Sequence, residues 1–408
     1  MSGTRWFPTM LLISIFQVIT FYQVIFSADG TLNMAAAIVF VIFTAIEWLW
    51  SVVSTIFLKK SSLALEYIAF FLTGISLVVA GSVKGSLMVK QFIAVVIGFV
   101  CYVVLLYIVS DVERAEKFRK PFAIASIAVL VFTLIFAKNI NGAYNWLSFG
   151  GFAVQPSELV KVSFIFVGAA TLEKLQSKRS LTQYVIFAAA CIALLFLMRD
   201  LGTALIFFFT FVVLAFMRSG DVRTIIFLIL GAAMLAGLVV LMRSDYIMNR
   251  FATYRHVWDY ASGKGYQQTR VLTYSVSGGL LGLGIGNGHL RDIFAATEDL
   301  IFGVLCEEWG MLIAFLVAQA FIFIFIHSIR CAKGARSAFY SIASCAAGGL
   351  LLFQAALNIF GVTDFLPMTG VTLPFVSRGG SSTISCWALL AFIKAADNRT
   401  WAEVKKKK

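Results

Sequence analysis

Charged residues are scarce in this 408-residue chain: 13% of residues are Asp, Glu, Lys or Arg, whereas 60% are hydrophobic. A soluble domain of this size needs far more polar surface than that. Several apolar runs reach about 20 residues, the length that crosses a hydrocarbon core of about 30 Å, whereas a soluble helical protein shows shorter runs. We therefore predict an all-α, polytopic membrane protein.

Cysteine and histidine are also few, and they are far apart in the sequence. No two of the six cysteines have the close spacing of a metal site or a disulfide, so they are interpreted as small core hydrophobes. The three histidines, His256, His289 and His327, are too scattered to predict a metal cluster. No internal repeat and no Pro- or Ser-rich linker divides the chain.

About twelve apolar runs are expected to span the membrane. They are Trp6–Phe26, Met34–Phe57, Tyr67–Val83, Phe92–Val109, Phe122–Ala137, Pro156–Leu172, Tyr184–Met198, Leu201–Met217, Thr224–Met242, Leu300–Ile326, Ala338–Phe360 and Gly379–Ile393. The first run lacks a small-residue cleavage site and is followed at once by another, so it does not resemble a cleaved signal peptide.

The distribution of basic residues predicts the orientation. With the N-terminus inside, 21 of the 33 Lys and Arg residues fall in cytoplasmic segments and 11 outside, with Lys161 within a span. Both termini are then cytoplasmic, and the basic end Lys405–Lys408 is a tail near anionic lipid. The large loop Arg243–Glu298 is extracellular.

The start of that loop has a helical apolar pattern. Ile247, Phe251, Tyr254 and Trp258 recur at helical spacing, which predicts an amphipathic helix lying in the membrane interface. It is either a simple anchor or one wall of a site for a lipid-linked substrate.

Three ionisable residues lie in or beside spans on the predicted outer side: Glu158 and Lys161 in the sixth, and Asp200 at the start of the eighth. Such groups cost roughly 2.5–3.5 kcal/mol each to insert and therefore mark candidate sites. Glu158 and Lys161 share a helix face, and Lys161 could pair with Asp200 as well as with Glu158. A purely structural ion pair is the alternative.

Asp299 lies at the predicted outer mouth of the tenth span, and Glu307 lies eight residues further on, or about 12 Å deeper. That separation is too long for a paired-carboxylate hydrolase, whose carboxyl groups lie roughly 5–9 Å apart. The pattern favours a base at the mouth and a buried structural or substrate-binding acid. Alternatively, Glu298 and Asp299 simply cap the helix.

Two glycine-rich segments adjoin these acids. Gly278–Gly288 has no surrounding βαβ unit, so it is not a dinucleotide motif, and it predicts a tight turn or close approach to a ligand. Leu373–Ser382 leads into the last span, where glycines, hydroxyls and a helix N-terminus could hold a diphosphate.

Taken in order, these segments resemble the shape, elongation, division and sporulation (SEDS) family. The resemblance covers Tyr67 to Ile393, and the ordered set is far more specific than any one motif. The motifs are Asn141-Gly-Ala143 with Trp146, Gln155-Pro-Ser-Glu-Leu-Val-Lys161, Asp200-Leu-Gly-Thr-Ala204, Gly265-Tyr-Gln-Gln268, Gly278-Gly279, Asp299-Leu-Ile-Phe302 with Glu307-Glu308, and Leu366-Pro-Met-Thr-Gly370 with Ser377 and Gly379-Gly-Ser-Ser382.

The chain also departs from the family pattern. Tyr144-Asn145 stands where the family usually has Arg or Lys before the tryptophan, Glu298 intervenes between Thr297 and Asp299, and Arg378 replaces a usual tyrosine. Because the family core has ten spans, we expect residues 1–62 to be an added hairpin, 63–396 the core and 397–408 a cytoplasmic tail.

The resemblance implies a peptidoglycan glycosyltransferase that polymerises lipid II on the outer face of the cytoplasmic membrane, with Asp299 as general base. Its partners would be lipid II and a class B penicillin-binding protein, with no nucleic acid and no organic cofactor. Mg²⁺ or Mn²⁺ is a further candidate to offset diphosphate charge. A lipid II flippase and an inactive scaffold are the alternatives. The expected substrate-binding residues are Gln155, Ser157, Glu158, Lys161, Asp200, Arg255, Tyr266, Gln267, Arg270, Glu307, Glu308, Ser377, Gly379, Gly380 and Ser381.

Overall fold

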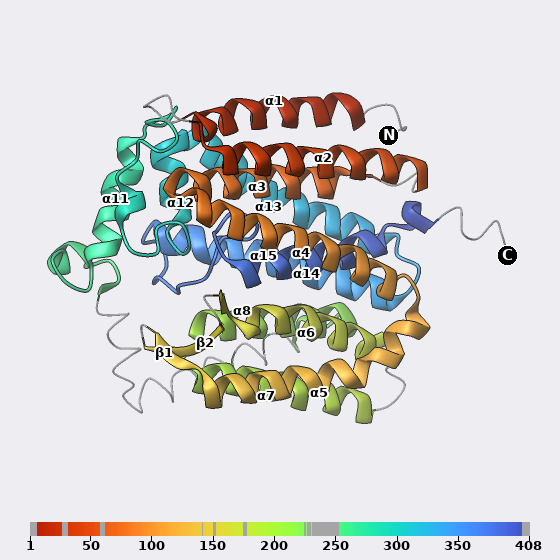
Figure 1. Ribbon diagram of the computed structural model, residues 1–408. Coiled ribbons are helices and arrows are strands. Elements are labelled where there is room, and N and C mark those ends of the chain that lie inside the picture. Colours follow the sequence, from red (N-terminus) through yellow and green to blue (C-terminus); the bar gives the residue numbers. More distant parts are fainter. Residues whose placement is uncertain are drawn as a thin grey trace.

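The computed structural model is a bundle of long helices (Figure 1). It describes residues 6–26, 32–57, 62–140, 142–149, 152–173, 178–223, 226, 230 and 253–401. The long helices are α1 (Trp6–Ile25), α2 (Met34–Phe57), α3 (Ala64–Val83), α4 (Gly85–Val109), α5 (Val112–Phe136), α6 (Pro156–Glu173), α7 (Lys178–Leu197), α8 (Leu201–Ser219), α11 (Tyr266–Ser277), α13 (Gly310–Lys333), α14 (Ala338–Val362) and α15 (Gly380–Ala396).

Eleven of the twelve predicted spans fall on helices, and the prediction of a polytopic all-α protein is confirmed. Among the described residues, eight helices are long and apolar enough to cross a membrane, and two shorter apolar helices cover Thr182–Leu197 and Gly380–Ala396. The ninth predicted span, Thr224–Met242, lies outside the described residues except for Ile226 and Leu230.

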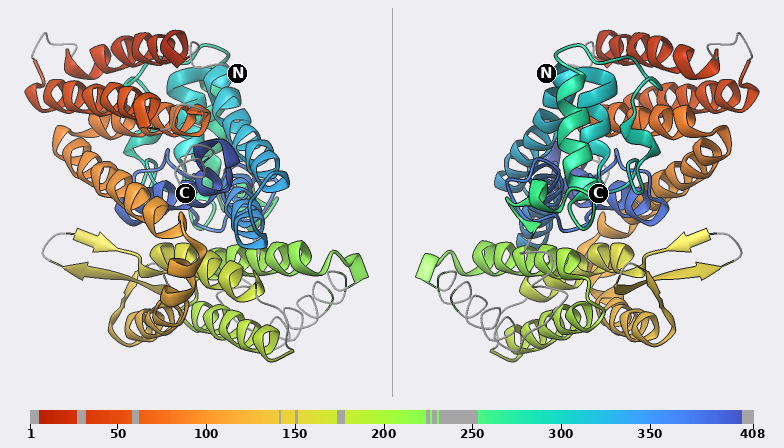
Figure 2. Two further views of the ribbon diagram at one scale, coloured as in Figure 1. Left: turned by 90° about the vertical axis from the view of Figure 1, so that its right-hand side faces the viewer. Right: turned by 90° about the vertical axis from the view of Figure 1, so that its left-hand side faces the viewer.

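The helices form two groups. In Figure 1, α5, α6, α7 and α8 lie together below α1 to α4 and α13 to α15, and Figure 2 shows the same division from both sides. The two groups meet where α14 packs on α6 and α8 and where α15 packs on α6. The start of α1 and the end of α15 lie at the same end of the bundle.

A buried polar contact joins the first two helices. Gln17 Nε2 of α1 donates to Glu47 Oε1 of α2 at 2.8 Å, and both side chains are buried. Helix α1 also packs on α3, and α2 packs on α4. The buried carboxylate of Glu47 thus has a polar partner on the neighbouring helix. The boundary of the N-terminal hairpin stays a prediction.

A small antiparallel sheet follows α5, which the sequence did not predict. Its strands are β1 (Lys138–Ile140), β2 (Ala143–Phe149) and β3 (Phe152–Val154), and β2 lies in the middle. Leu147 is opposite Val154, and Phe149 is opposite Phe152. The sheet ends at Val154, and after Gln155 the helix α6 begins at Pro156 as predicted, because proline fits the first position of a helix.

The predicted interfacial helix lies partly outside the described residues, and its described part is not one continuous helix. Arg255 has a φ of 60°, which a right-handed helix cannot contain. A short 3-10 helix, η1 (Val257–Tyr260), follows this break. Val257 is buried, whereas Trp258 is exposed.

The tenth predicted span, Leu300–Ile326, begins within one residue of the helix there, but that helix is not uniform. Asp299 lies in a turn, followed by α12 (Ile301–Val304), a π-helical turn η3 (Leu305–Trp309) and then α13. Leu300 is the N-cap residue of α12, with no side-chain capping bond. Glu298 and Asp299 lie directly before Leu300, so the alternative that their charges stabilise the N-terminus of this helix stays a prediction.

Candidate functional site

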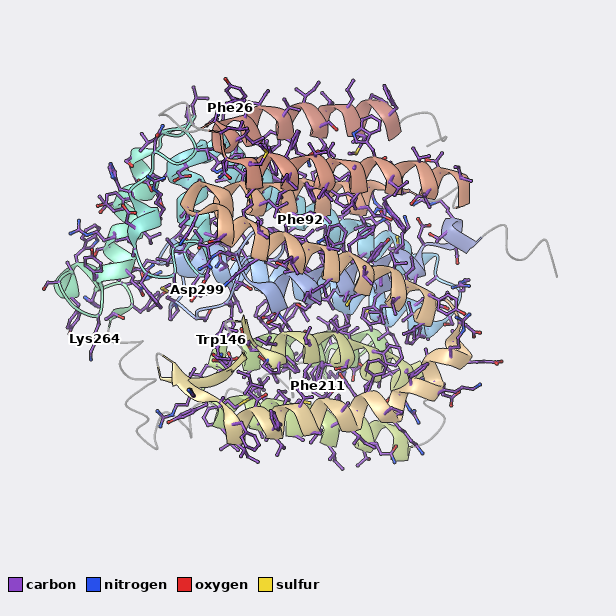
Figure 3. All side chains as sticks on the ribbon, viewed as in Figure 1. Phe26, Phe92, Trp146, Phe211, Lys264 and Asp299 are labelled. Carbon is purple, nitrogen blue, oxygen red and sulfur yellow. The ribbon has the colours of Figure 1, made fainter. Side chains whose placement is uncertain are left out.

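A cavity of about 610 Å³ brings together residues that the sequence separates widely. Its lining comes from α4, β2, β3, the start of α6, α8, the turn before α12 and the turn before α15. Trp146 and Asp299, which both line it, lie at the end of the bundle that carries the sheet and Lys264 (Figure 3).

The lining of the cavity contains both polar and apolar side chains. Asp299, Gln155 and Glu158 are among the polar lining residues. Ile93 and Ile97 of α4 and Leu159 of α6 also line it, and these three side chains are more than 40% exposed on the surface of the bundle. In a membrane, such apolar exposure faces lipid, so the cavity can take a ligand with a polar head and a hydrocarbon tail.

The backbone of Asp299 is held at the cavity by a hydrogen bond, and Gly370 lies close to its side chain. Asn358 Nδ2 of α14 donates to Asp299 O and to Val371 O, each at 2.8 Å. Gly370 has a φ of 71°, and a Cβ built there would lie 3.5 Å from Asp299 Oδ2. Asn358 therefore ties the turn of Asp299 to the chain that leads into α15.

Asp200 lies behind the cavity and orients two amides at its wall. Its Oδ2 accepts from Asn145 Nδ2 at 2.9 Å and from Gln155 Nε2 at 3.0 Å, and its Oδ1 caps α8 by accepting from Thr203 N at 3.2 Å. Ser381 Oγ of α15 accepts from Gln155 N at 2.9 Å. Gln155 and Ser381, two of the expected substrate-binding residues, thus line the cavity, whereas Asp200 lies outside the lining and positions Asn145 and Gln155.

Lys161 pairs with Glu158 but not with Asp200. Lys161 Nζ lies 2.6 Å from Glu158 Oε2 and donates to Gln354 Oε1 of α14 at 2.8 Å. Glu158 Oε2 also accepts from Ser385 Oγ of α15 at 3.0 Å. The suggested pairing with Asp200 is wrong, because the carboxylate of Asp200 already accepts from amides. Glu158 lines the cavity, and Lys161 is buried outside its lining.

The N-terminus of α15 opens into the cavity. Gly379, Gly380 and Ser381 line it, and the first N–H groups of a helix lack partners within that helix. Gln91 Oε1 of α4 accepts from Gly379 N at 3.2 Å, and Gln91 Nε2 donates to Thr383 Oγ1 at 2.9 Å. Gln91 thereby fixes the first turn of α15 against α4.

Ser377 and Ser157 are buried and do not line the cavity. Ser377 Oγ donates to Glu298 O at 2.6 Å and accepts from Leu373 N at 2.8 Å. Ser377 therefore stabilises the turn before Asp299 through the carbonyl of Glu298.

Glu307 and Glu308 lie in the π-helical turn and hold the glycine-rich segment rather than the cavity wall. Glu307 accepts from His289 N at 2.8 Å and Leu290 N at 2.9 Å, and Glu308 Oε2 accepts from Gly286 N at 3.0 Å. A Cβ on Gly278 would lie 2.1 Å from Cys306 O. The sequence predicts a tight turn or a close approach to a ligand for these glycines. The group that Gly278 approaches closely is protein backbone.

Four expected substrate contacts in the loop also lie outside the lining of the cavity. Gln267 Nε2 donates to Phe294 O at 2.9 Å, so it supports a lining segment. Arg270 lies over the ring of Tyr266, with Cζ 5.3 Å from the ring centroid, and Arg255 lies 5.4 Å from that of Tyr254.

The cationic side chains that line the cavity are not among the substrate-binding residues expected from the sequence. Lys90 of α4 and Arg378 both line the cavity. Arg378 forms an ion pair with Glu298, and both side chains are about one-third exposed. Lys90 and Gln91 interrupt an otherwise apolar run, and this was the signal available in the sequence.

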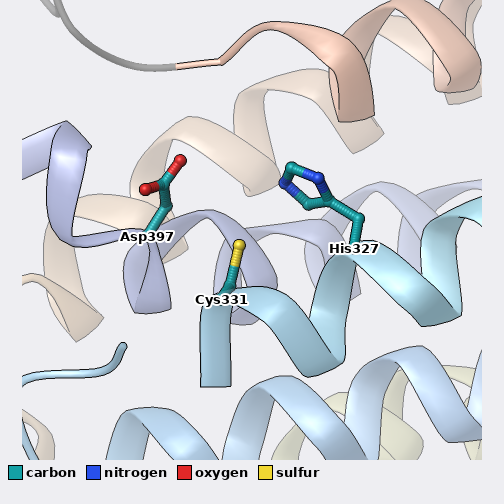
Figure 4. Close-up of side chains that lie close together, drawn as sticks. All are labelled: His327, Cys331 and Asp397. Atoms are coloured by element: carbon teal, nitrogen blue, oxygen red, sulfur yellow. The ribbon is translucent and has the colours of Figure 1, made fainter. Parts of the chain in front are cut away.

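At the other end of α13, the structure brings His327 and Cys331 close to Asp397 (Figure 4). Their ligand atoms lie within 4.8 Å of one another, which contradicts the expectation that no histidine or cysteine clusters in this way. Both oxygens of Asp397 accept from Arg399, at 2.8 and 2.9 Å. Burial alone would raise the pKa of Asp397, but these bonds outweigh it and lower the pKa. The carboxylate is therefore already neutralised by an arginine.

Comparison with known proteins places the chain in a family. A Borreliella burgdorferi protein named probable peptidoglycan glycosyltransferase FtsW is 32% identical over 288 residues, which are 67% of this chain and 76% of that protein. Stage V sporulation protein E of Bacillus subtilis is 31% identical over 250 residues, 59% of this chain and 68% of that protein.

The fold also matches a solved structure. A chain reported under the heading of structural coordination of polymerization and crosslinking by a peptidoglycan synthase complex superimposes with a TM-score of 0.70. The match is 23% identical and covers 84% of this chain and 98% of that one, so it establishes a common fold. The family model for FtsW, RodA and SpoVE, described as cell cycle protein, matches residues 54–401. The chain therefore belongs to the FtsW, RodA and SpoVE family of cell cycle proteins.

Proposed function

We propose that this protein is a peptidoglycan glycosyltransferase that polymerises lipid II into glycan strands. The single observation that carries the proposal is that Asp299 and the N-terminus of α15 line the same cavity, together with exposed apolar side chains of α4 and α6. Asp299 thus offers a carboxylate, and the N-terminus of α15 offers an anion site. The transfer of a sugar from a lipid diphosphate requires both groups.

In the proposed reaction, a hydroxyl of the acceptor sugar attacks the anomeric carbon of the other substrate. A new glycosidic C–O bond forms, the bond from the anomeric carbon to the phosphate oxygen breaks, and the lipid diphosphate leaves with the bonding electrons. Asp299 accepts the hydroxyl proton, which contributes a factor of roughly 10²–10⁴ in rate.

The leaving diphosphate would lie at the N-terminus of α15. The backbone N–H groups of Gly380 and Ser381 and the cation of Lys90 are the groups placed to stabilise its charge. Lys161 is too deeply buried for this role, and Arg255 and Arg270 do not line the cavity. The hydrocarbon tail would pass between α4 and α6 along Ile93, Ile97 and Leu159.

A divalent cation would need the substrate as part of its ligand set. Three carboxylates line the cavity: Glu158, which pairs with Lys161, Glu298, which pairs with Arg378, and Asp299. Mg²⁺ is commonly held by one or two carboxylates together with substrate phosphates. Mg²⁺ or Mn²⁺ bound there would screen the diphosphate charge.

The orientation and the partner belong to the same proposal. The basic residues favour cytoplasmic termini, which places the cavity on the outer face of the cytoplasmic membrane. A class B penicillin-binding protein, whose transpeptidase crosslinks new strands, is the proposed partner. A role in elongation, division or sporulation fits the family equally well.

A lipid II flippase is the rival function. Alternating access places ionisable groups near the membrane midplane. Here Asp299, Glu298 and Arg378 gather at one end of the bundle, which favours chemistry at one membrane face.

Purified protein in liposomes that contain fluorescent lipid II discriminates the two functions. The proposal predicts long glycan products on a denaturing gel. Transfer of label between leaflets without any polymer would instead support the flippase. If the protein neither forms polymer nor transfers label, the result would support a scaffold.

A further inference from the structure

The two side chains that depart from the family pattern around Asp299 contact each other. Glu298 and Arg378 are 80 residues apart in sequence, and the Arg378 guanidinium forms an ion pair with Glu298 Oε1. Glu298 directly precedes Asp299, and Arg378 directly precedes the glycines that begin α15. The pair therefore joins the turn that carries the proposed base to the turn that carries the proposed anion site.

The ion pair is one of several bonds between these two turns. Arg378 N donates to Thr297 O at 2.7 Å, and Arg378 Nε donates to Thr297 Oγ1 at 3.0 Å. Ser377 Oγ donates to Glu298 O at 2.6 Å. The hydrogen bonds to the backbone of Thr297 and Glu298 and the Glu298–Arg378 ion pair all join the same two turns. Together they restrict how Asp299 can move relative to Gly379.

The position of the pair gives it a consequence that an ordinary surface ion pair lacks. Exposed ion pairs contribute little to stability. Glu298, Asp299, Arg378 and Gly379 all line the cavity, however, so a displacement of either turn changes the distance between base and leaving group. Displacements of about 1 Å can lower a rate by as much as roughly 10²-fold.

We propose that Glu298 and Arg378 are positioning residues: their ion pair holds the Asp299 turn and the N-terminus of α15 in register for glycosyl transfer. The chemical part of this inference rests on the proposed function, whereas the mechanical coupling of the two turns does not. Neither side chain is assigned a proton transfer, and the pair acts through Asp299 and the first turn of α15.

The test compares Glu298→Gln, Arg378→Gln, the double variant and Arg378→Lys, all as full-length protein in nanodiscs. Each single substitution should lower kcat about tenfold with little change in KM, because orientation and not substrate affinity is lost. The double variant should be no worse than either single one, since both break the same contact. Arg378→Lys keeps the charge and should recover part of the activity.

Hydrogen exchange of residues 294–300 and 370–382 supplies a readout that needs no turnover. Each Gln substitution should speed exchange in both segments, because the turns are no longer coupled. The matched control is Asp111→Asn with Arg114→Gln, which removes an ion pair with N···O 3.4 Å at the N-terminus of α5 and should change neither readout.

The outcomes separate the two ideas. A wild-type protein that does not polymerise, yet shows coupled exchange, would refute the function and retain the coupling. If the wild type polymerises and the single variants match it in kcat and in exchange, the positioning proposal is wrong. It is also wrong if the losses are additive in the double variant, or if exchange rises only in the segment that carries the substitution.

Discussion

Lys161 Nζ lies 2.6 Å from Glu158 Oε2 in a buried ion pair within α6. The pair is completed by Gln354 of α14, which accepts from Lys161, and by Ser385 of α15, which donates to Glu158. Because α6 belongs to one group of helices and α14 and α15 to the other, this network lies where the two groups meet (Figure 1).

Removing only the lysine should therefore destabilise the fold. Lys161→Met leaves Glu158 buried without its cation, which costs about 3–5 kcal/mol. We expect a lowered thermal unfolding midpoint in detergent. Lys161→Met combined with Glu158→Gln removes both charges and should restore most of the loss. A single variant as stable as the wild type would show that the pair does not hold these helices together.

The close packing of Gly278 predicts a second stability effect. A methyl group in Gly278→Ala would meet Cys306 O at 2.1 Å and Glu307 O at 2.5 Å, and backbone cannot move aside easily. Overpacking of this kind costs roughly 3 kcal/mol. Gly263→Ala is the control, because its nearest neighbour would be Tyr260 O at 3.9 Å. Equal unfolding midpoints for the two variants would contradict the assigned packing.

The proposed orientation can be tested on two exposed positions. A cysteine at Gly263, in the loop before α11, should react with an impermeant thiol reagent in spheroplasts. A cysteine at Lys117, near the start of α5, should react only after the membrane is opened. Cys101 is the native thiol that is not fully buried, so it should first be replaced by serine. The reverse labelling pattern would invert the topology and place the cavity on the cytoplasmic face.

The sequence predicts the helices well because length and hydropathy decide them locally. Pro156 begins α6, and the described runs coincide with helices. The cavity is predicted in part: Asp299, Gln155 and Gly379 meet there, as the ordered motifs imply.

Contacts between distant helices could not be read from the sequence. Gln91 meets Thr383 across 292 positions, and Asn358 meets Asp299 across 59, so both depend on how the bundle packs. The sequence leaves Glu307 either a structural or a substrate-binding role. Its carboxylate accepts from the N–H groups of His289 and Leu290, which fits the structural role.

The role of Asp299 is the central claim, and Asp299→Asn tests it most directly. The substitution keeps the size of the side chain and removes its basicity. Asp292→Asn is the matched control, since Asp292 is exposed in the 3-10 helix η2 (Leu290–Asp292) and does not line the cavity. The measurement is single-turnover polymerisation of fluorescent lipid II by purified protein at equal concentrations. We predict that Asp299→Asn lowers the rate by roughly 10²-fold or more while Asp292→Asn retains it. A rate for Asp299→Asn equal to that of the wild type would remove this carboxylate from the reaction and contradict the account.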